Sequence, residues 1–350
     1  MQPTPAPSRT YKLFVGIDIA AATATVAWLT LGGTVSRPLT IEQTPHGFAL
    51  LRDRLAALGY APDETLVVME ATGTYWLRVA TALTEAGFAV SVINPEQAHD
   101  FAKALLQRAK TDAIDAQTLA RLAAMLQPAP WSPPPAIYEE LQQRLTQRQA
   151  LIGLRQQVRN QRHALLQNPR AVAAVRERMD QLIATMTSQI AELDAEIAAA
   201  LDTDAGWAAA AARLQTITGI GLITTAWLLV ATLNFTLCPS PAAATAYAGL
   251  APNPRRSGTS VRGRASIGHY GHAPLRTALY LAALSAAQHN PVIRPFYERL
   301  LRAGKTKKVA RCAAARKLLH IAWAVTTKGQ PFDPHYQERG GAPGNLLTLA

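Results

Sequence analysis

A proline-rich segment at residues 127–135, QPAPWSPPP, divides this chain of 350 residues into two parts of different character. Proline has no backbone N–H to donate and restricts the residue before it, so neither a helix nor a strand continues through such a run. Before the segment, short apolar runs alternate with helix-forming stretches. After it, the sequence favours helices almost throughout. We therefore expect an α/β domain over residues 11–127 and mainly helical domains beyond residue 135.

The first part contains five apolar runs with strand character. Gly32-Gly33 marks a turn between the second and third runs, so the first three predict an antiparallel meander. A meander followed by alternating helices and strands is the order of an RNase H-like fold. The predicted strands are Leu13–Ile19, Thr23–Leu31, Thr34–Ile41, Thr65–Met69 and Ala89–Ile93, and the predicted helices are His46–Leu58, Tyr75–Glu85 and others through about Leu126.

The second part predicts two helical regions. Residues 136–204 fit a coiled-coil-like helical hairpin with its break near Asn168-Pro169. Its first arm is rich in arginine and its second arm is acidic, so opposite charges favour antiparallel pairing of the two arms. Residues 205–333 predict a mainly helical domain with a Gly/Arg/Ser-rich loop at about 249–272, and residues 334–350 predict a loose tail.

The positive charge of the chain is concentrated in one segment. The whole chain has a formal net charge of +12. Between Asn253 and Lys317, ten arginines and four lysines accompany a single acid, Glu298, so this segment alone carries a net charge of +13. Such a concentration indicates a nucleic-acid-binding surface, because a charge that served only solubility would be spread more evenly.

Composition excludes several other classes of protein. Two cysteines, Cys238 and Cys312, are too few for a disulfide framework or a Cys-rich zinc module. The most apolar stretch, Leu222–Phe235, is shorter than the roughly 20 residues that a bilayer requires. The N-terminal residues MQPTPAPSRT lack the apolar core of a secretory signal. We expect a cytoplasmic, nucleoid-associated protein with no membrane partner.

Three further features point to nucleic acid, and each has a plain structural alternative. Arginines recur at helical spacing on the first arm. They would form either a stripe that binds a phosphate backbone or a solvated helix face. A glycine pair in LQTITGIGLITTAWLL predicts a helix-hairpin-helix turn that binds phosphate, or close helix packing. The lysines of GKTKK fit a basic surface and lack the spacing of an ATP-binding loop. These residues are Arg144, Arg148, Arg155, Arg159 and Arg162, then Gly219 and Gly221, then Lys305, Lys307 and Lys308.

Four carboxylates stand where they could bind metal ions together. Asp18 ends the first apolar run, and Glu70 directly follows the run TLVVM. Asp112 and Asp115 are three residues apart in KTDAIDA, so on a helix they share one face. Each acid alone also fits a turn, a helix entry or an N-cap. Taken together, with an RNase H-like order of elements, they predict a site for one or two Mg²⁺ or Mn²⁺ ions.

A second constellation is the run PRRSGTSVRGR at residues 254–264. Glycine lets the backbone approach a ligand closely, and arginine provides bidentate contacts to phosphate. Ser257 fits a nucleophile whose attack on a phosphate the arginines would stabilise. Alternatively, Ser257, Thr259 and Ser260 fit a phosphate-binding loop whose hydroxyls only donate hydrogen bonds. The chemistry leaves both interpretations open, and the arginines concerned are Arg255, Arg256, Arg262 and Arg264.

Seven motifs, in order across residues 13–333, resemble those of the bridge-RNA-guided insertion-sequence transposases, relatives of the Piv-type DNA invertases. They are GIDIA, MEATGTYW, VSVINP, KTDAIDAQTLA, ITGIG, AYAGLAP and SGTSVRG. The resemblance implies a RuvC-like DEDD domain in which Asp18, Glu70, Asp112 and Asp115 bind Mg²⁺. It also implies a C-terminal transposase domain in which Ser257 is the nucleophile.

The same resemblance implies a mechanism and partners. The serine attacks a DNA phosphate, forms a phosphoserine link and releases a 3′-hydroxyl, in a site that two protomers build together. The partners are DNA at the element ends and the target, a structured guide RNA, and further copies of the chain in a homodimer or homotetramer. Exposed apolar stripes on long helices also favour self-association.

One motif departs from the pattern of the family. Many relatives carry Ile/Met-Ser-Lys-x-Gly after the serine motif, whereas this chain has Ile267-Gly268-His269-Tyr270-Gly271 and lacks that lysine. Two other functions remain open on the residues alone. The first is a RuvC-like metal-dependent nuclease or junction resolvase, which would use the carboxylates without Ser257. The second is a non-catalytic nucleic-acid-binding protein, in which only the basic segment matters.

Overall fold

The structure is a computed structural model that describes residues 10–71, 73–106, 111–253, 256–257, 261–262, 266–268 and 270–335. The chain separates into two compact units, residues 1–133 and 134–350, so the division falls within the proline-rich segment. Within the described residues, no helix is both long and apolar enough to cross a membrane.

The first unit is built on a five-stranded sheet in the order β3-β2-β1-β4-β5. β2 pairs antiparallel with both β1 and β3, whereas β4 pairs parallel with both β1 and β5. This topology confirms the RNase H-like fold. The strands are β1 (Leu13–Ile19), β2 (Thr23–Thr30), β3 (Leu39–Glu42), β4 (Thr65–Glu70) and β5 (Ala89–Ile93); the helices are α1 (Pro45–Ala56), η1 (Pro62–Glu64), α2 (Trp76–Glu85), α3 (Pro95–Ala104) and α4 (Asp112–Leu126).

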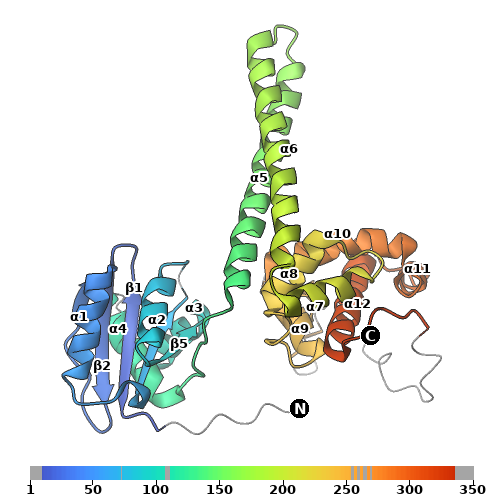
Figure 1. Ribbon diagram of the computed structural model, residues 1–350. Helices are drawn as coiled ribbons and strands as arrows, with labels where there is room; N and C mark the ends of the chain where they lie inside the picture. Colours follow the sequence, from blue (N-terminus) through green and yellow to red (C-terminus); the bar gives the residue numbers. More distant parts are fainter. Residues whose placement is uncertain are drawn as a thin grey trace. The chain divides into compact units, whose positions relative to one another are not determined.

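Helices cover both faces of this sheet (Figure 1). Successive residues of a strand point to opposite faces, so each strand supplies two cores. Leu13, Val15 and Ile17 of β1 pack in one core with α1 and α2. Phe14 of β1 packs in the other core with Leu119 of α4. The even-numbered residues of β1 and β4 therefore face α4.

The third predicted strand is shorter than expected. Residues 34–38 are not strand, and β3 begins only at Leu39. The backbone N–H of Trp28 in β2 donates to the Ser36 hydroxyl (3.0 Å), where a ladder would use a backbone carbonyl. Pro38 has no N–H to donate at the next step. A hydrogen bond to a side chain and a proline thus explain why β3 begins at Leu39 and not at Thr34.

The second unit is helical apart from four two-residue strands among the described residues. Its core is formed by α7, α8, α9, α10 and α12 together with the adjoining ends of α5 and α6. The helices are α5 (Ala136–Leu166), α6 (Ala173–Leu201), α7 (Ala205–Gln215), α8 (Leu222–Thr232), α9 (Pro241–Tyr247), α10 (Ala273–His289), α11 (Ile293–Arg302) and α12 (Lys307–Lys328). Of the predicted tail, residues 336–350 lie outside the described residues.

α5 and α6 form an antiparallel hairpin that extends beyond the other helices of the unit (Figure 1). Three ion pairs link the basic arm to the acidic arm: Arg144 with Glu196 (3.0 Å), Arg148 with Asp194, and Arg162 with Asp180. These contacts confirm that opposite charges pair the two arms.

A charge reversal should show how much these pairs contribute. We expect Arg148→Glu to lower the free energy of unfolding by about 1–2 kcal/mol, because it replaces a charged hydrogen bond to Asp194 with a repulsion. Adding Asp194→Arg should restore most of the loss, which chemical denaturation of the two single variants and the double variant would measure. Arg159→Glu, at a position with no ion pair in the described structure, is the matched control. Equal losses in the double and the single variants would contradict the pairing.

Candidate functional site

Two of the four predicted carboxylates lie at adjacent strand ends on the same face of the sheet. β1 and β4 are parallel, with Ile17 opposite Met69, so Asp18 and Glu70 follow at the carboxyl ends of neighbouring strands. Both belong to the even-numbered set that faces α4. The sheet therefore brings together two residues that are far apart in sequence.

The other two carboxylates stand in the first turn of α4. The N-cap of this helix is Thr111, whose hydroxyl accepts a hydrogen bond from the amide of Ile114 (3.3 Å). The alternative interpretation of Asp112 as the N-cap is therefore wrong. Asp112 and Asp115 are inside the helix, near its positive end, where the dipole favours negative charge.

Gly16 allows α4 to lie directly on the sheet next to Asp18. A Cβ atom at this position would be 2.2 Å from the carbonyl oxygen of Ala116 and 2.3 Å from the amide nitrogen of Ala120. The backbone of α4 therefore crosses β1 closer than any side chain permits. Gly16 and Asp18 share a face, and Ala116 directly follows Asp115, so this crossing places the first turn of α4 beside Asp18.

Burial and the other three acids raise the pKa of Asp18. Partial burial, followed by the negative charges of Asp115, Asp112 and Glu70 in that order, raises the pKa of Asp18 to about 6. Each of the other three predicted residues thus contributes to the field at Asp18. Within the described residues, however, no group of three or more His, Cys, Asp or Glu side chains is arranged as a ready metal-binding cluster.

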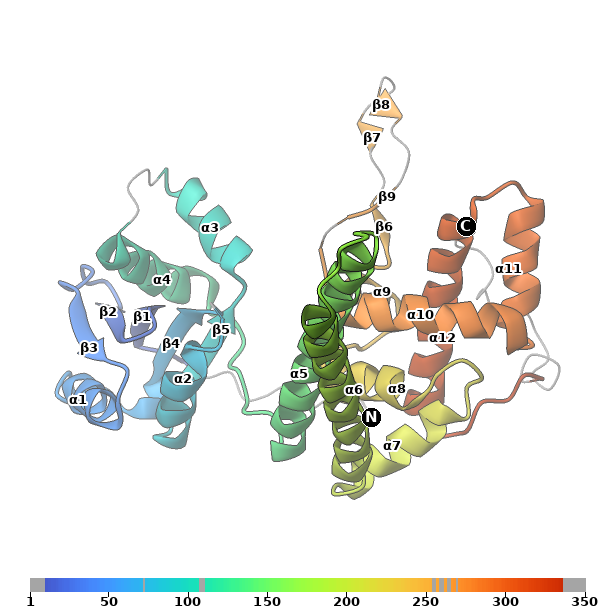
Figure 2. The same cartoon turned by 90° about the horizontal axis from the view of Figure 1, so that it is seen from above.

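The serine-containing segment forms short antiparallel strands. β6 (Pro252–Asn253) pairs with β9 (Ser266–Ile267), and β7 (Arg256–Ser257) pairs with β8 (Val261–Arg262). Figure 2 shows β7 and β8 beyond β6 and β9. The register places Arg256 opposite Arg262, so two cationic residues occupy paired positions. The predicted phosphate contacts Arg255 and Arg264 and the hydroxyl residues Thr259 and Ser260 lie outside the described residues.

Two glycines hold the base of this segment together. Gly249 (φ +68°) and Gly271 (φ +87°) have positive φ, which favours glycine, and their backbones touch. A Cβ atom at Gly271 would be 2.5 Å from the amide nitrogen of Gly249. The amide of His272 donates to the carbonyl of Tyr247 (2.8 Å) across the same point. The final glycine of the departing motif is thus structural, and Tyr270, 65% exposed, contributes its carbonyl to the base.

The remaining predicted contacts occupy varied surroundings. Arg144 and Arg148 bind α6, and Arg155 donates to Thr187 (3.2 Å), so these arginines are engaged within the hairpin. Gly219 (φ +104°) packs on Ala286 of α10, which is the packing alternative for that glycine. The other predicted positions, Arg159 of α5, Gly221 at the start of α8, and Lys305, Lys307 and Lys308 before and within α12, lie at exposed sites.

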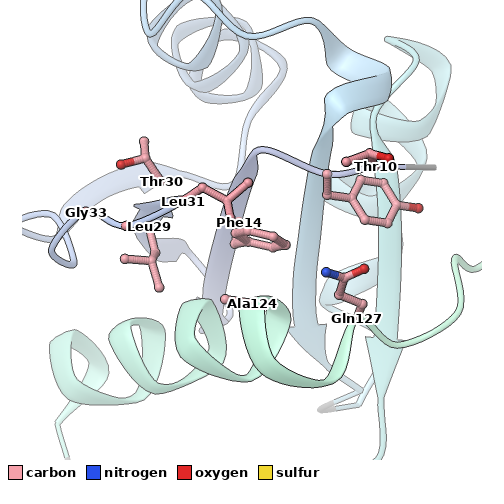
Figure 3. Close-up of a pocket in the computed structure, with 10 residues that line it drawn as sticks. Thr10, Phe14, Leu29, Thr30, Leu31, Gly33, Ala124 and Gln127 are labelled. Carbon is pink, nitrogen blue, oxygen red and sulfur yellow. The ribbon is translucent and has the colours of Figure 1, made fainter.

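A cavity of about 380 Å³ in the first unit is at the other end of β1 (Figure 3). Its lining includes Phe14, Leu29, Ala124 and Gln127. These residues lie near the start of β1 and the end of α4, whereas the carboxylates are at the end of β1 and the start of α4. As far as the structure describes it, the lining contains no acid and no basic residue. This cavity is separate from the carboxylate site.

Comparison with known proteins places these features in a family. A family of DEDD transposases of the IS110 type matches residues 15–169, and the transposase IS116/IS110/IS902 family matches residues 211–298. The pilin gene-inverting protein of Moraxella bovis is 33% identical over 331 residues, which cover 93% of this chain and 99% of that protein. The chain belongs to the IS110 family of transposases. It is a DNA recombinase, and the first matched region contains all four carboxylates while the second contains Ser257.

Two more similarities are partial. An uncharacterized 43.6 kDa protein of insertion element IS110 from Streptomyces coelicolor is 32% identical over 120 residues, or 34% of this chain and 29% of that protein. A structure of T. thermophilus RuvC in complex with a Holliday junction substrate covers 34% of this chain and 99% of the RuvC chain, at 17% identity and a TM-score of 0.24.

Sequence reasoning missed several residues that shape the site of this IS110-family transposase. Gly16 stands inside a buried strand, where glycine is unfavourable, and that conflict is a usable sign of close backbone approach. Gly249 and Gly271 lie in a segment already rich in glycine, so only the structure separates them from their neighbours. Arg276 lies inside α10, outside every predicted motif, and no pattern in the sequence distinguishes it.

Proposed function

We propose that this transposase cuts and rejoins DNA through a covalent bond to Ser257, assisted by divalent metal held by Asp18, Glu70, Asp112 and Asp115. The observation that carries the proposal is the arrangement of the four acids: Asp18 and Glu70 end adjacent parallel strands, and Asp112 and Asp115 lie in the first turn of the helix that crosses at Gly16. A fold alone would not require four acids at one sheet edge, since their repulsion opposes folding.

The residues present fit Mg²⁺ or Mn²⁺. Carboxylate oxygens are the ligands that these hard cations prefer, and a cation would offset the repulsion that raises the pKa of Asp18. When bound, such an ion would stabilise negative charge on a transferring phosphate. Glu70 and Asp18 would hold it from the sheet, and Asp112 and Asp115 from α4. Holding these two elements together is the contribution of Gly16.

In the proposed covalent step, the Ser257 hydroxyl oxygen forms a bond to a DNA phosphorus. The bond from that phosphorus to the 3′-oxygen breaks, and the proton lost from serine ends on the released 3′-hydroxyl. The phosphodiester energy is kept in the phosphoserine bond, so a 3′-hydroxyl can later attack it and restore the serine. The cationic pair Arg256 and Arg262, at opposed positions of β7 and β8, supports this assignment, because like charges so placed favour a polyanionic ligand.

The proposed partners are DNA at the element ends and the target, and a structured guide RNA. The unit that contains Ser257 also carries most of the positive charge of the chain, which would bind the phosphate backbone irrespective of sequence. We propose that two or four copies of the chain assemble, with the carboxylates of one copy acting on the strand held by the serine of another.

A covalent-adduct assay tests the proposal. The wild type, Ser257→Ala, Asp18→Ala and the matched hydroxyl control Ser260→Ala are incubated with element-end DNA, Mg²⁺ and the RNA that co-purifies, then resolved on a denaturing gel. We expect a protein–DNA adduct in the wild type and in Ser260→Ala, and at least a 100-fold reduction in Ser257→Ala and Asp18→Ala.

Each other outcome indicates a different function. An adduct that persists in Ser257→Ala would refute the serine assignment. Cleavage without any adduct would indicate a metal-dependent nuclease that uses water, and DNA binding with neither product would indicate a non-catalytic binding protein. The guide RNA has its own test, because sequencing of co-purified RNA should recover one structured transcript encoded beside the gene. Recovery of unselected cellular RNA would count against guidance.

A further inference from the structure

Arg276, in the first turns of α10, contacts the base of the segment that contains Ser257 and the strands β6 to β9, which we call the serine hairpin. Its Nη1 donates a hydrogen bond to the carbonyl oxygen of Tyr270 (2.8 Å), just before the crossing of Gly271 over Gly249. The guanidinium also fills the space beside Gly249, since a Cβ atom there would be 2.1 Å from Nη1. The two chain segments that enter and leave the hairpin therefore meet at this one side chain.

The position is electrostatically unfavourable for an arginine. α10 has no acidic residue in its first turn, and a cation near a helix N-terminus opposes the helix dipole. Arg276 is partly buried and, within the described residues, forms no ion pair with a carboxylate. A neutral side chain would fill this place at lower electrostatic cost. A residue that departs from the local preference in this way often serves the site rather than stability.

Other contacts hold the base of the serine hairpin on both sides of Tyr270, and Arg276 binds the backbone between them. The amides of Gly249 and Leu250 donate to Ala246 and Thr245 (both 2.9 Å), which extends α9 up to the crossing. On the other side, the His272 ring caps α10 by accepting from the amide of Leu275 (3.1 Å) and stacks on Tyr247. Between these two anchors, the Tyr270 carbonyl has Arg276 as its donor.

We propose that Arg276 is a positioning residue for the transposition reaction: its guanidinium clasps the Tyr270 carbonyl across Gly249 and so sets the direction in which the hairpin presents Ser257. This inference rests on the proposed role of Ser257 as nucleophile. The planar guanidinium suits the task because it can donate to a carbonyl while filling a flat space beside a glycine. Its action on the phosphate is indirect, through the hairpin.

The test combines a structural measurement with a kinetic one on full-length protein. In Arg276→Ala, we expect amide hydrogen exchange in residues 247–253 and 266–272 to become at least tenfold faster. We expect the single-turnover rate of adduct formation at saturating DNA to fall at least tenfold, while the Kd for DNA stays within threefold. Guanidinium ion at millimolar concentration should restore part of that rate. Arg178→Ala, which removes an exposed arginine of α6, is the charge-matched control and should change neither quantity.

The outcomes distinguish a failure of the proposed role of Arg276 from a failure of the proposed role of Ser257. Unchanged exchange in Arg276→Ala would overturn the clasp, and faster exchange with an unchanged adduct rate would overturn the positioning role. A rate that recovers fully at high DNA concentration, with a weakened Kd, would make Arg276 a DNA contact and would also overturn it. If the adduct forms equally in Ser257→Ala, the nucleophile assignment fails, and hydrogen exchange still decides whether Arg276 holds the hairpin base.

Discussion

Replacing Asp18 with asparagine should make the protein more stable while it abolishes DNA cleavage. The pKa of Asp18 is raised from 3.8 to about 6, so the folded state binds its proton more tightly than the unfolded state does. This tighter proton binding adds to the free energy of unfolding of the wild type below pH 4. The added stability is lost as the pH rises from about 4 through 6. At pH 7.5 the ionised carboxylate is therefore a net cost, which asparagine removes.

The size of this effect follows from the shift. Two pKa units correspond to roughly 3 kcal/mol, and partial exposure of Asp18 reduces this, so we expect a gain of about 1–2 kcal/mol at pH 7.5. Chemical denaturation at pH 4.5 and 7.5 would measure it, and the advantage of Asp18→Asn should be small at the lower pH. Glu85→Gln, which replaces an exposed acid at the end of α2, is the matched control.

Mg²⁺ should stabilise the wild type more than it stabilises Asp18→Asn. We expect millimolar Mg²⁺ to raise the Tm of the wild type, because a ligand of the folded state stabilises it, and to have much less effect on Asp18→Asn. A wild type that is more stable than the variant at pH 7.5 without metal would contradict the proposed repulsion among the four carboxylates.

The second large effect is expected at Gly16. Replacement by alanine would put a Cβ atom 2.2 Å from the Ala116 carbonyl oxygen, and backbone atoms on both sides cannot yield as a flexible side chain can. We expect Gly16→Ala to lower the free energy of unfolding of the first unit by about 3 kcal/mol, or to prevent its folding. In any folded fraction, α4 must move away from β1 and carry Asp112 and Asp115 with it, so DNA cleavage should be lost.

A glycine without this constraint supplies the control. Gly153 lies inside α5, and nothing within 4 Å would meet a Cβ atom there. Gly153→Ala should therefore raise stability by about 0.5–1 kcal/mol, the ordinary gain on replacing glycine within a helix. Thermal unfolding of the two variants should show shifts of opposite sign. If Gly16→Ala proved as stable as the wild type, the close crossing of α4 over β1 would be refuted.

Much of the first unit is predictable because local patterns and burial agree there. The runs Leu13–Ile19 and Ala89–Ile93 are strands with the predicted bounds, since apolar residues flanked by turn residues leave few alternatives. The order of elements then determines the sheet. The pairing of α5 with α6 was equally predictable, because charges of opposite sign on the two arms point to antiparallel contact.

Other features depend on contacts that no local pattern contains. β3 begins late because the Ser36 hydroxyl captures the amide of Trp28, a bond made only after the chain turns back. The arginine stripe read as a phosphate-binding face is in part an ion-pair face, because the same spacing serves both and the partner arm is distant in sequence. Likewise, Gly219 is explained by Ala286, which lies far along the chain on α10.

Side chains of β1 alternate between the two faces of the sheet, so the same short run of residues determines both the position of the acid and the packing of both cores. Gly16 admits α4, Asp18 stands two residues later on the same face, and Val15 and Ile17 fill the opposite core. A one-residue insertion or deletion between Val15 and Asp18 would turn the acid towards α1 and α2 and at the same time misplace one of the two cores. Length variation among active descendants of this chain should therefore be absent from β1 and tolerated at the bend between α5 and α6.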